Sequence, residues 1–436
     1  MKKWLHILLA LVMVLSLAAC GQEPVSDQPQ QPPAAEAGES GDLSVQPVKL
    51  TVWGYKDDQE NLKKLLEQFQ ALYPEQAFEL TLEVKSGLAA RAALLSGVAT
   101  ADVFAFSFEH LDALARGEAL LELADEASAA LEKHAGITLE EAMAQNVPAS
   151  VDAATGEKGL MAFPAGGGEN ALLFYDSNVF APADVESWES LLDAAQRAGT
   201  HVGAVVTDGA FTGSFFMGAG FSAYMVEDGS TIADFNGVGT TGQTGVQVLR
   251  SLLDITAHPG FMSVTARKEE ETLAEGGLSA IVLEVGDADL AQEAFGENFA
   301  AAVLPSFTAG GKTLRQTSFA RYELVGVNAN TEQADWAVVL AQFLTNEAAQ
   351  LARFESSDLV PVNLAAVASE AVAADPMASV AAQQDKYSVP DRTGTVYPEA
   401  ALMLGKRIVE KDYSDDETAL QNWLDGYVEE VGAPCT

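Results

Sequence analysis

FPAGGGENALLFYD, residues 163–176, places three consecutive glycines and a glutamate directly before an apolar segment with the composition of a β-strand. A glycine run of this kind can be a phosphate-binding loop, a plain turn, a hinge or the rim of a binding site. A phosphate-binding loop requires a spacing such as GxxxxGKS or GxxxxGKT, with a helix directly after it. This stretch has no lysine and a strand-like segment follows it, so the phosphate-loop interpretation is disfavoured.

An alternation of strand and helix patterns precedes the glycines. KLTVWGY (49–55), FELTLEV (78–84) and ADVFAFS (101–107) have the composition of strands. Between them lie a segment with apolar residues at helical spacing (62–72) and one rich in alanine and leucine (88–97). The order strand, helix, strand, helix, strand is typical of a parallel α/β sheet with right-handed crossovers.

A second α/β pattern follows the glycines. Strands are expected at 170–176, 201–208, within 271–287 and at 300–307, the last leaving this unit, and helices at 186–199, within 238–257 and within 271–287. A stop is expected at Gly199, and residues 317–354 continue with a strand and an amphipathic helix. The two patterns together predict two α/β units, one on each side of the glycine run.

The N-terminal segment has the layout of a secretory signal peptide, with two lysines, an apolar run from Ile7 to Leu17 and small residues before Cys20. The apolar run is shorter than the roughly 20 residues that a membrane-spanning helix needs. Leu-Ala-Ala-Cys (17–20) resembles the bacterial lipobox, which implies cleavage after residue 19 and a diacylglycerol on Cys20. Ordinary secretion with an incidental cysteine is the alternative.

Residues 20–47 are predicted to be the lipidated cysteine and a disordered tether. Positions 21–46 contain no aromatic residue and are rich in proline, glutamine, glycine and serine, so they cannot bury enough apolar surface to fold. Random-coil scaling gives this tether a reach of roughly 30 Å. About 390 residues follow it, which indicates two domains.

The composition argues against several classes of partner. The chain has 24 Lys+Arg and 63 Asp+Glu, and removing Lys2 and Lys3 with the signal peptide leaves 22 against 63, a formal charge of −41. Such an acidic surface repels nucleic acid and anionic lipid head groups. Basic partners and cationic ligands stay open, although a solubilising acidic surface is the simpler interpretation.

Neither disulfides nor metal sites are expected. Cys20 and Cys435 are the only cysteines, and lipidation of the first leaves the second without an intrachain partner. Cysteine-pair spacings are absent, and the five histidines show no HExxH-like spacing. We therefore expect no cofactor and no metal.

Taken together, several segments resemble the extracellular solute-binding proteins of carbohydrate-type ABC importers, the family of the maltose-binding proteins. The resemblance covers nearly all of residues 48–434. Its marks are KLTVWGY, ADVFAF, LLFYDSNVF with SWESLL after it, ETLAEGGLSAIVLE, AVLPSF, and WAVVLAQFLTNEAAQ followed by LVPVN.

The resemblance implies an α/β fold of the two-lobe periplasmic-binding type (type II, or Venus-flytrap), with the ligand in a cleft between the lobes. One lobe would comprise residues 48–165 and 306–345, and the other residues 166–305 and 346–434. Gly166, Gly167 and Gly168 would then be a hinge at the first crossing between the lobes, where few residues absorb the change of backbone angles. A plain turn is the alternative.

The same resemblance implies where the protein acts. The closed, ligand-bound form would dock as a monomer on a membrane permease driven by a separate ATPase. The expected lipid anchor would place it on the outer face of the cell membrane. A Gram-positive envelope fits best, and a Gram-negative lipoprotein also fits.

The ends of the first and third predicted strands carry the first candidate ligand contacts, because ligands bind at the carboxyl ends of strands in such sheets. Aromatic faces lie there beside hydrogen-bonding side chains. These candidates are Trp53, Tyr55, Asp57, Asp58, Phe106 and Glu109. The alternative is that Trp53 and Phe106 are core residues and that Asp57 or Asp58 caps a helix.

The resemblance adds contacts further along the chain. Carboxylates accept paired hydrogen bonds from vicinal hydroxyls, and an aromatic face covers the apolar face of a sugar ring. The residues at the matching positions are Glu169, Asp208, Phe211, Glu284, Asp287 and Tyr397. Glu284 and Asp287, in LEVGDAD, stand where the maltose-binding proteins have a stacking tryptophan.

This departure favours a mono- or disaccharide or a polyol over a long maltodextrin, because Phe106 is also a smaller platform than tryptophan. The function expected is therefore capture of a mono- or oligosaccharide for import, without catalysis. The acid-rich set leaves a cation such as a polyamine open, and a receptor that presents ligand to a sensor kinase is a further alternative. An anchored glycosidase with paired carboxylates is the least favoured.

Overall fold

The computed structural model describes residues 46–97, 100–226, 230–357, 359–393 and 397–433. The signal peptide, Cys20, almost all of the tether and Cys435 lie outside these residues. Within the described ranges, no helix combines the length and the apolar character needed to cross a membrane.

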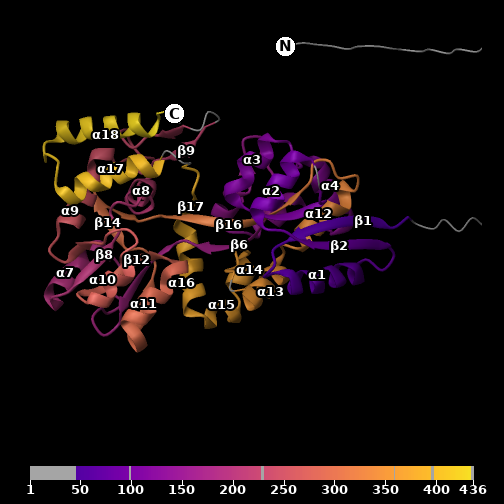
Figure 1. Ribbon diagram of the computed structural model, residues 1–436, viewed down its shortest axis with the longest axis horizontal. Helices are drawn as coiled ribbons and strands as arrows, with labels where there is room; N and C mark the ends of the chain where they lie inside the picture. The colour runs from indigo at the N-terminus through magenta and orange to yellow at the C-terminus, as the bar shows by residue number, and fades with distance from the viewer. Residues whose placement is uncertain (1–45, 98–99, 227–229, 358, 394–396, 434–436) are drawn as a thin grey trace, which may run out of the picture. The chain divides into compact units, whose positions relative to one another are not determined.

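The first sheet has the strand order β17-β16-β3-β1-β2, and β6 pairs with β16 off this path (Figure 1). Strand β1 (Val48–Gly54) pairs parallel with β2 (Phe78–Val84) and with β3 (Val103–Ser107). Helices α1 (Gln59–Leu72) and α2 (Gly87–Ser96) connect these strands. The predicted parallel α/β unit before the glycines is thus confirmed.

Two later segments complete this sheet. Strand β16 (Ser318–Val327) runs antiparallel to β3 and to β6 (Ala162–Glu169), and parallel to the short β17 (Ser388–Pro390). Sequence periodicity alone gave no partner for β16, because pairing between segments that are far apart in the chain leaves no local signal.

The second sheet has the order β11-β8-β12-β7-β13. It contains β7 (Ala171–Asp176), β8 (His201–Ala204), β11 (Phe261–Ser263), β12 (Leu278–Glu284) and β13 (Phe299–Ala302). Strand β7 pairs antiparallel with both β12 and β13, whereas β8 pairs parallel with β11 and β12, so the sheet is mixed.

Helix α7 (Trp188–Ala198) illustrates how local sequence sets these elements. The Ser187 side chain accepts a hydrogen bond from the Ser190 amide at the start of the helix. Gly199, at φ +70°, ends it in the left-handed conformation that favours glycine. The stop predicted at Gly199 is confirmed.

The segment expected as one strand at 300–307 is divided. Residues 299–302 form β13, and β14 (Ser306–Ala309) pairs with β15 (Lys312–Arg315) as a separate hairpin. Phe307 and Leu314 of this hairpin belong to the core that surrounds Trp188, beside the second sheet. We therefore propose a lobe boundary near residue 316 rather than at residue 306. The boundary expected after residue 345 also moves later along the chain, because helix α13 (Glu347–Ser357) packs against α1 of the first lobe, with Ala349 in the core of that lobe.

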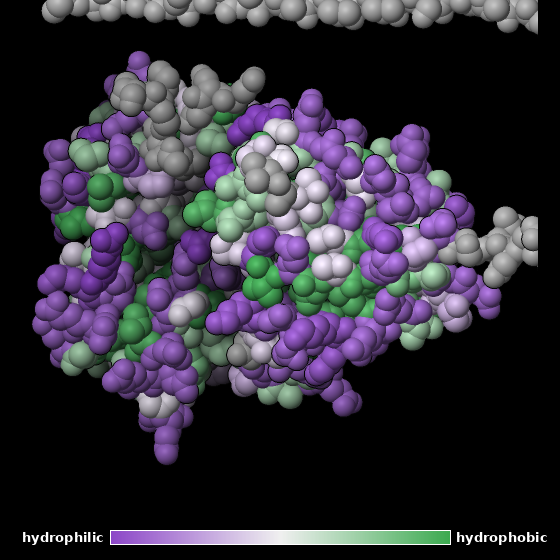
Figure 2. Space-filling view, turned by 45° about the vertical axis from the view of Figure 1, so that its right-hand side comes forward, coloured by the Kyte–Doolittle hydropathy of each residue, from purple (hydrophilic) through white to green (hydrophobic). Residues whose placement is uncertain are grey.

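The remaining helices and short strands cover the two sheets (Figure 1). Around the first sheet these are α3 (Leu111–Arg116), α4 (Asp125–His134), α5 (Leu139–Ala144), α6 (Pro148–Ala153), β4 (Thr155–Gly156), β5 (Gly159–Leu160), α12 (Ala334–Phe343), α13 (Glu347–Ser357) and α14 (Leu364–Val367). Around the second are α8 (Gly209–Gly218), β9 (Ala223–Met225), β10 (Thr231–Ala233), α9 (Gly245–Ala257), α10 (Glu269–Glu275), α11 (Ala288–Phe295), α15 (Glu370–Ala374), α16 (Pro376–Gln384), α17 (Tyr397–Glu410) and α18 (Glu417–Val431). The face of the molecule in Figure 2 is mostly hydrophilic, in keeping with the acidic composition.

The glycine run lies in β6 and contains a β-bulge. Pairing with β16 steps from Arg321 opposite Glu169 to Glu323 opposite Gly166, and then to Leu324 opposite Pro164, so β6 carries one extra residue at each of these two steps. Gly168, at φ +87°, supplies the left-handed conformation that the bulge needs. A bulge re-aims the side chains beside it, and here it sets Glu169 directly across from Arg321.

The three glycines also let another segment approach closely. A Cβ on Gly166 would lie 2.5 Å from Leu359, and one on Gly168 would lie 2.5 Å from Val360. The Gly167 amide donates to the Val360 carbonyl at 2.9 Å. The run is therefore a buried, close-packed strand, and the hinge role of its three glycines stays a prediction.

We expect Gly167→Ala to destabilise the protein. Its Cβ would lie 2.7 Å from the Tyr322 ring, which is buried and hydrogen-bonded to Asp385 at 3.1 Å and so cannot move aside freely. Overpacking of this kind costs typically about 1–3 kcal/mol. Urea unfolding measures the change.

Gly426→Ala in α18 is the matched control, because a Cβ there meets no described atom within 4 Å. At an exposed position inside a helix, alanine is more favourable than glycine by about 1 kcal/mol. This variant should therefore be as stable as wild type or more stable. Equal stability of the two variants would show that the crossing has room for a side chain.

Candidate ligand-binding site

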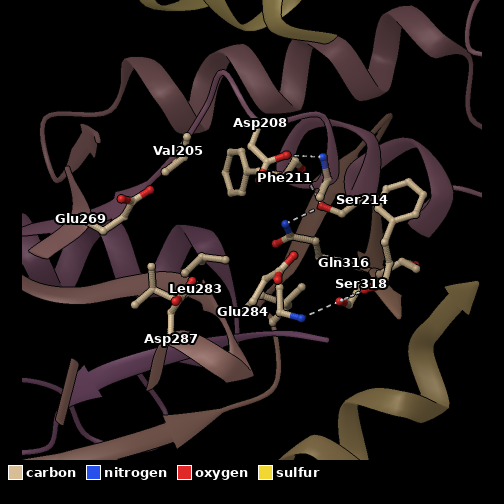
Figure 3. Close-up of a pocket in the computed structure, with 16 residues that line it drawn as sticks. Val205, Asp208, Phe211, Ser214, Glu269, Leu283, Glu284, Asp287, Gln316 and Ser318 are labelled. Carbon is tan, nitrogen blue, oxygen red and sulfur yellow. Dashed lines mark hydrogen bonds between the residues drawn. The ribbon is translucent and has the colours of Figure 1, made fainter. Parts of the chain in front are cut away.

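Two adjoining pockets lie where elements of the two sheets meet, and both are lined by Asp208, Ala210, Glu284 and Phe319. The first pocket (Figure 3) is completed by Ala171, Val205, Phe211, Ser214, Glu269, Val282, Leu283, Asp287, Leu304, Gln316, Thr317 and Ser318. The second is completed by Glu169, Gly209, Arg321, Asp391, Thr393, Tyr397 and Pro398. Six of the predicted contacts therefore surround one hollow.

Asp208 reaches the pockets from the start of α8. Its carboxylate caps the helix by accepting a hydrogen bond from the Ala210 amide at 2.9 Å. Burial raises the pKa of Asp208, and the charges of Asp391 and Glu269 add to the rise. Figure 3 shows Asp208 and Phe211 on one side of the hollow, with Glu284 facing them from the end of β12.

Glu284 and Glu169 both pair with Arg321. The Arg321 Nη2 atom donates to Glu284 Oε1 at 3.1 Å, and Nη1 lies 3.7 Å from Glu169 Oε2. Burial raises the pKa of Glu284, the Arg321 charge opposes this, and the charge of Asp208 adds to it. The arginine therefore offsets only part of the negative charge at the hollow.

The apolar wall of the first pocket is held by a buried polar chain. Phe211 packs edge-on against Trp188, with ring centroids 6.0 Å apart. The fully buried Gln316 accepts from Trp188 Nε1 at 2.6 Å and donates to Ser214 Oγ at 2.8 Å. These bonds join the residue before β16 to α7 and α8.

Tyr397 lines the second pocket but is only 2% exposed. Its hydroxyl donates to the Gly209 carbonyl at 3.2 Å, and burial raises its pKa well above the usual value. The neighbouring Thr393 hydroxyl donates to Asp391 Oδ1 at 2.7 Å. Tyr397 thus supports the start of α8 and offers the pocket little of its ring.

Trp53 and Phe106 are core residues in this structure. They are 2% and 1% exposed, and neither lines the two pockets. The Trp53 indole donates to Glu83 Oε2 at 3.1 Å. The core interpretation raised for both residues is the one that their surroundings support.

The polar residues that follow β1 and β3 have different surroundings, and none of them lines the two pockets. Asp58 forms a mostly buried ion pair with Arg353 at 2.8 Å, which joins the start of α1 to α13. Asp57 and Glu109 are exposed and lie outside the pocket lining. Tyr55 is half-buried and hydrogen-bonds Glu323, so it lies beside the crossing of β6 and β16.

Sequence reasoning missed several polar residues of this region. Arg321, Asp391, Thr393 and Gln316 line the pockets, and Glu323 lies two residues beyond Arg321 on β16. Glu323 Oε2 is buried and has no hydrogen-bond partner among the described residues. Burial raises the pKa of Glu323 to about 7. Two charged residues inside the otherwise apolar run TSFARYELVGV were the available signal.

Comparison with known proteins identifies the class. The family model described as bacterial extracellular solute-binding protein matches residues 64–380, so the chain belongs to that family. Among curated protein sequences, no significant match is found.

Solved structures show the fold. The maltodextrin-binding protein MalE1 from L. casei BL23, without ligand, is 20% identical at a TM-score of 0.69 and covers 89% of this chain and 99% of its own. A cyclo/maltodextrin-binding protein complexed with maltotetraose is 18% identical at 0.68, covering 88% and 97%. The periplasmic maltose-binding protein MalE from Listeria monocytogenes, in complex with maltose, is 16% identical at 0.66, covering 89% and 99%. The fold is therefore the two-lobe α/β fold that the sequence predicted.

The raised pKa of Glu323 predicts a pH dependence of stability. In the unfolded chain this carboxyl has its usual pKa near 4.5, and in the folded protein about 7, so the folded state holds one more proton between these values. Its contribution is fully present below pH 4.5 and is lost as the pH rises to about 7. Relative to wild type, Glu323→Gln should therefore gain stability between pH 5 and pH 7.5, by ~3 kcal/mol at most.

Urea unfolding at the two pH values measures this difference. Because the pKa of the buried Asp385 is also raised to about 7, the quantity to compare is variant minus wild type. The exposed Glu332→Gln is the control for net charge. If both variants respond to pH alike, Glu323 does not titrate in this range.

Proposed function

We propose that the protein captures a small saccharide in the hollow between its two lobes and delivers it to a membrane permease. The observation that carries this proposal is the convergence of Asp208, Glu284 and Glu169 with the partly exposed Phe319 on one hollow. Carboxylates accept hydrogen bonds from sugar hydroxyls, and the aromatic ring covers a C–H face. The maltose and maltotetraose bound by similar structures support the same ligand class.

A short ligand fits this site better than a long chain. The aromatic residues that line the pockets are Phe211, Phe319 and Tyr397, and the first and last of these are almost fully buried. Each sugar unit of a long maltodextrin would need its own exposed stacking face. We therefore favour a mono- or disaccharide or a polyol.

Capture is coupled to delivery through the crossing of β6 and β16. A ligand that contacts both Glu284 on the second sheet and Glu169 beside the first stabilises whichever arrangement of the lobes brings these carboxylates together. We propose that a permease recognises this arrangement. The proposal involves a monomer and no chemical step.

We further propose that the protein is held to the outer face of the membrane by a lipid on Cys20, which lies outside the described residues. In a bacterial host, Cys20→Ser should move the protein from the membrane fraction to the medium. Cys435→Ser, the other cysteine, should leave it attached. Immunoblotting measures the amount of each variant in the membrane fraction and in the medium. Cys20→Ser protein that stays with the membrane would refute the lipid anchor.

A thermal-shift panel tests the ligand class. Maltose, other mono- and disaccharides, polyols, polyamines and amino acids are each added to protein that begins at residue 46. A ligand that binds only the folded state raises the melting temperature by mass action, so a neutral saccharide or polyol should raise it. A shift with amino acids alone would overturn the saccharide proposal.

Asp208→Asn locates the binding. Asparagine also caps helices well, so the start of α8 is kept while the charge is removed. Loss of a hydrogen bond to a charged group costs about 1.5–3 kcal/mol, or roughly 10- to 150-fold in Kd. The exposed Glu332→Gln should bind as wild type does in calorimetric titration. Unchanged affinity in Asp208→Asn would place the ligand elsewhere.

A further inference from the structure

The charge balance of the two pockets is dominated by a single cation. Of the described residues that line them, Arg321 is the only lysine or arginine. The carboxylates that share the lining are Glu169, Asp208, Glu269, Glu284, Asp287 and Asp391. Any ligand in these pockets is therefore surrounded by several carboxylates and one guanidinium.

Arg321 is placed by the register of β16 and not by a flexible loop. It lies directly opposite Glu169 in the antiparallel pairing of β16 with β6, next to the bulge that the glycines create. Cross-strand neighbours of opposite charge stabilise one another. Glu284 approaches the same guanidinium from the end of β12, in the other sheet.

The guanidinium holds these two carboxylates through different nitrogens. Nη2 donates to Glu284 at 3.1 Å, and Nη1 faces Glu169 at 3.7 Å. The arginine side chain is 48% exposed, so it forms part of the pocket wall and is open to a ligand. A guanidinium has five N–H donors, and the two contacts leave donors free for a ligand oxygen.

We propose that Arg321 selects ligands by charge, because its guanidinium occupies the position between Glu169 and Glu284 that the positive group of a cationic ligand would otherwise take. This inference rests on the proposed saccharide function and names the residue that sets its specificity. Neutral polyhydroxyl ligands are admitted at this position, and the ammonium groups of polyamines and similar cations are disfavoured there.

The physical reason is that a neutral hydroxyl and an ammonium group form different hydrogen bonds with Arg321, Glu169 and Glu284. A hydroxyl can accept from the guanidinium and donate to either carboxylate, so a sugar joins the existing pairs without breaking them. An ammonium group has no acceptor and needs a carboxylate of its own. To use Glu169 or Glu284, it must either displace Arg321 or lie a few ångströms from a like charge, which is unfavourable.

Arg321→Gln tests the inference, because glutamine keeps N–H donors and loses the charge. Spermidine is the cationic probe and maltose the neutral one, both titrated by calorimetry at low salt. We expect Arg321→Gln to bind spermidine at least about tenfold more tightly than wild type, and maltose affinity to change far less. Arg321→Lys keeps the charge and should keep the exclusion of spermidine.

Arg197→Gln is the matched control. It removes one positive charge from an exposed surface pair with Asp184, away from the pockets, and so reproduces the change in net charge alone. The gain in spermidine affinity should also shrink as salt is raised, since the pairs are partly exposed and are screened.

The inference is overturned if folded Arg321→Gln gains no spermidine affinity, or if Arg321→Lys or Arg197→Gln gains as much. Failure of the proposed function looks different. In that case wild type binds no neutral saccharide or polyol, whereas the ratio of spermidine affinities between Arg321→Gln and wild type still reports on charge selection.

Discussion

The close packing of β6 against β16 and the segment 359–362 is the constraint on which the rest of the structure depends. Three adjacent glycines remove the side chains that would keep these segments apart, and each of their missing Cβ atoms would fall within 3.0 Å of a neighbour. The resulting bulge fixes which residues of β6 and β16 face each other. The positions of Glu169, Arg321 and Glu323 all follow from this register.

The electrostatics of the hollow follow from the same register. Carboxylates from the end of β12, from the start of α8 and from β6 converge where strands of both sheets end, as expected for open α/β sheets. Repulsion from neighbouring carboxylates, Asp391 and Glu269 for Asp208 and Asp208 for Glu284, adds to burial in raising the pKa values of these two residues. Arg321 is the positive charge that reduces the repulsion among these carboxylates when no ligand is bound. It leaves most of their oxygens free to accept hydrogen bonds from ligand hydroxyls.

The fold was predictable where local pattern carried the information. Strand composition and apolar spacing predicted β1, α1, β2, α2 and β3 in order, and Gly199 marked the end of α7. The pattern failed where partners are distant. It showed AAAVLPSF as a single strand, because nothing local distinguishes β13, which pairs with β7, from β14, which turns back into a hairpin.

The sequence by itself determined the two α/β units, because strand and helix patterns depend on local order. The resemblance of its motifs to a known family indicated the two-lobe fold and named Asp208, Phe211 and Glu284, which surround the hollow. Only the tertiary structure decided that Trp53 and Phe106 are core residues, that Asp58 is bound to Arg353, and that Arg321 lies between Glu169 and Glu284. The physical reason is that strand register and long-range packing set the direction of a side chain, and neither is encoded in its immediate neighbours.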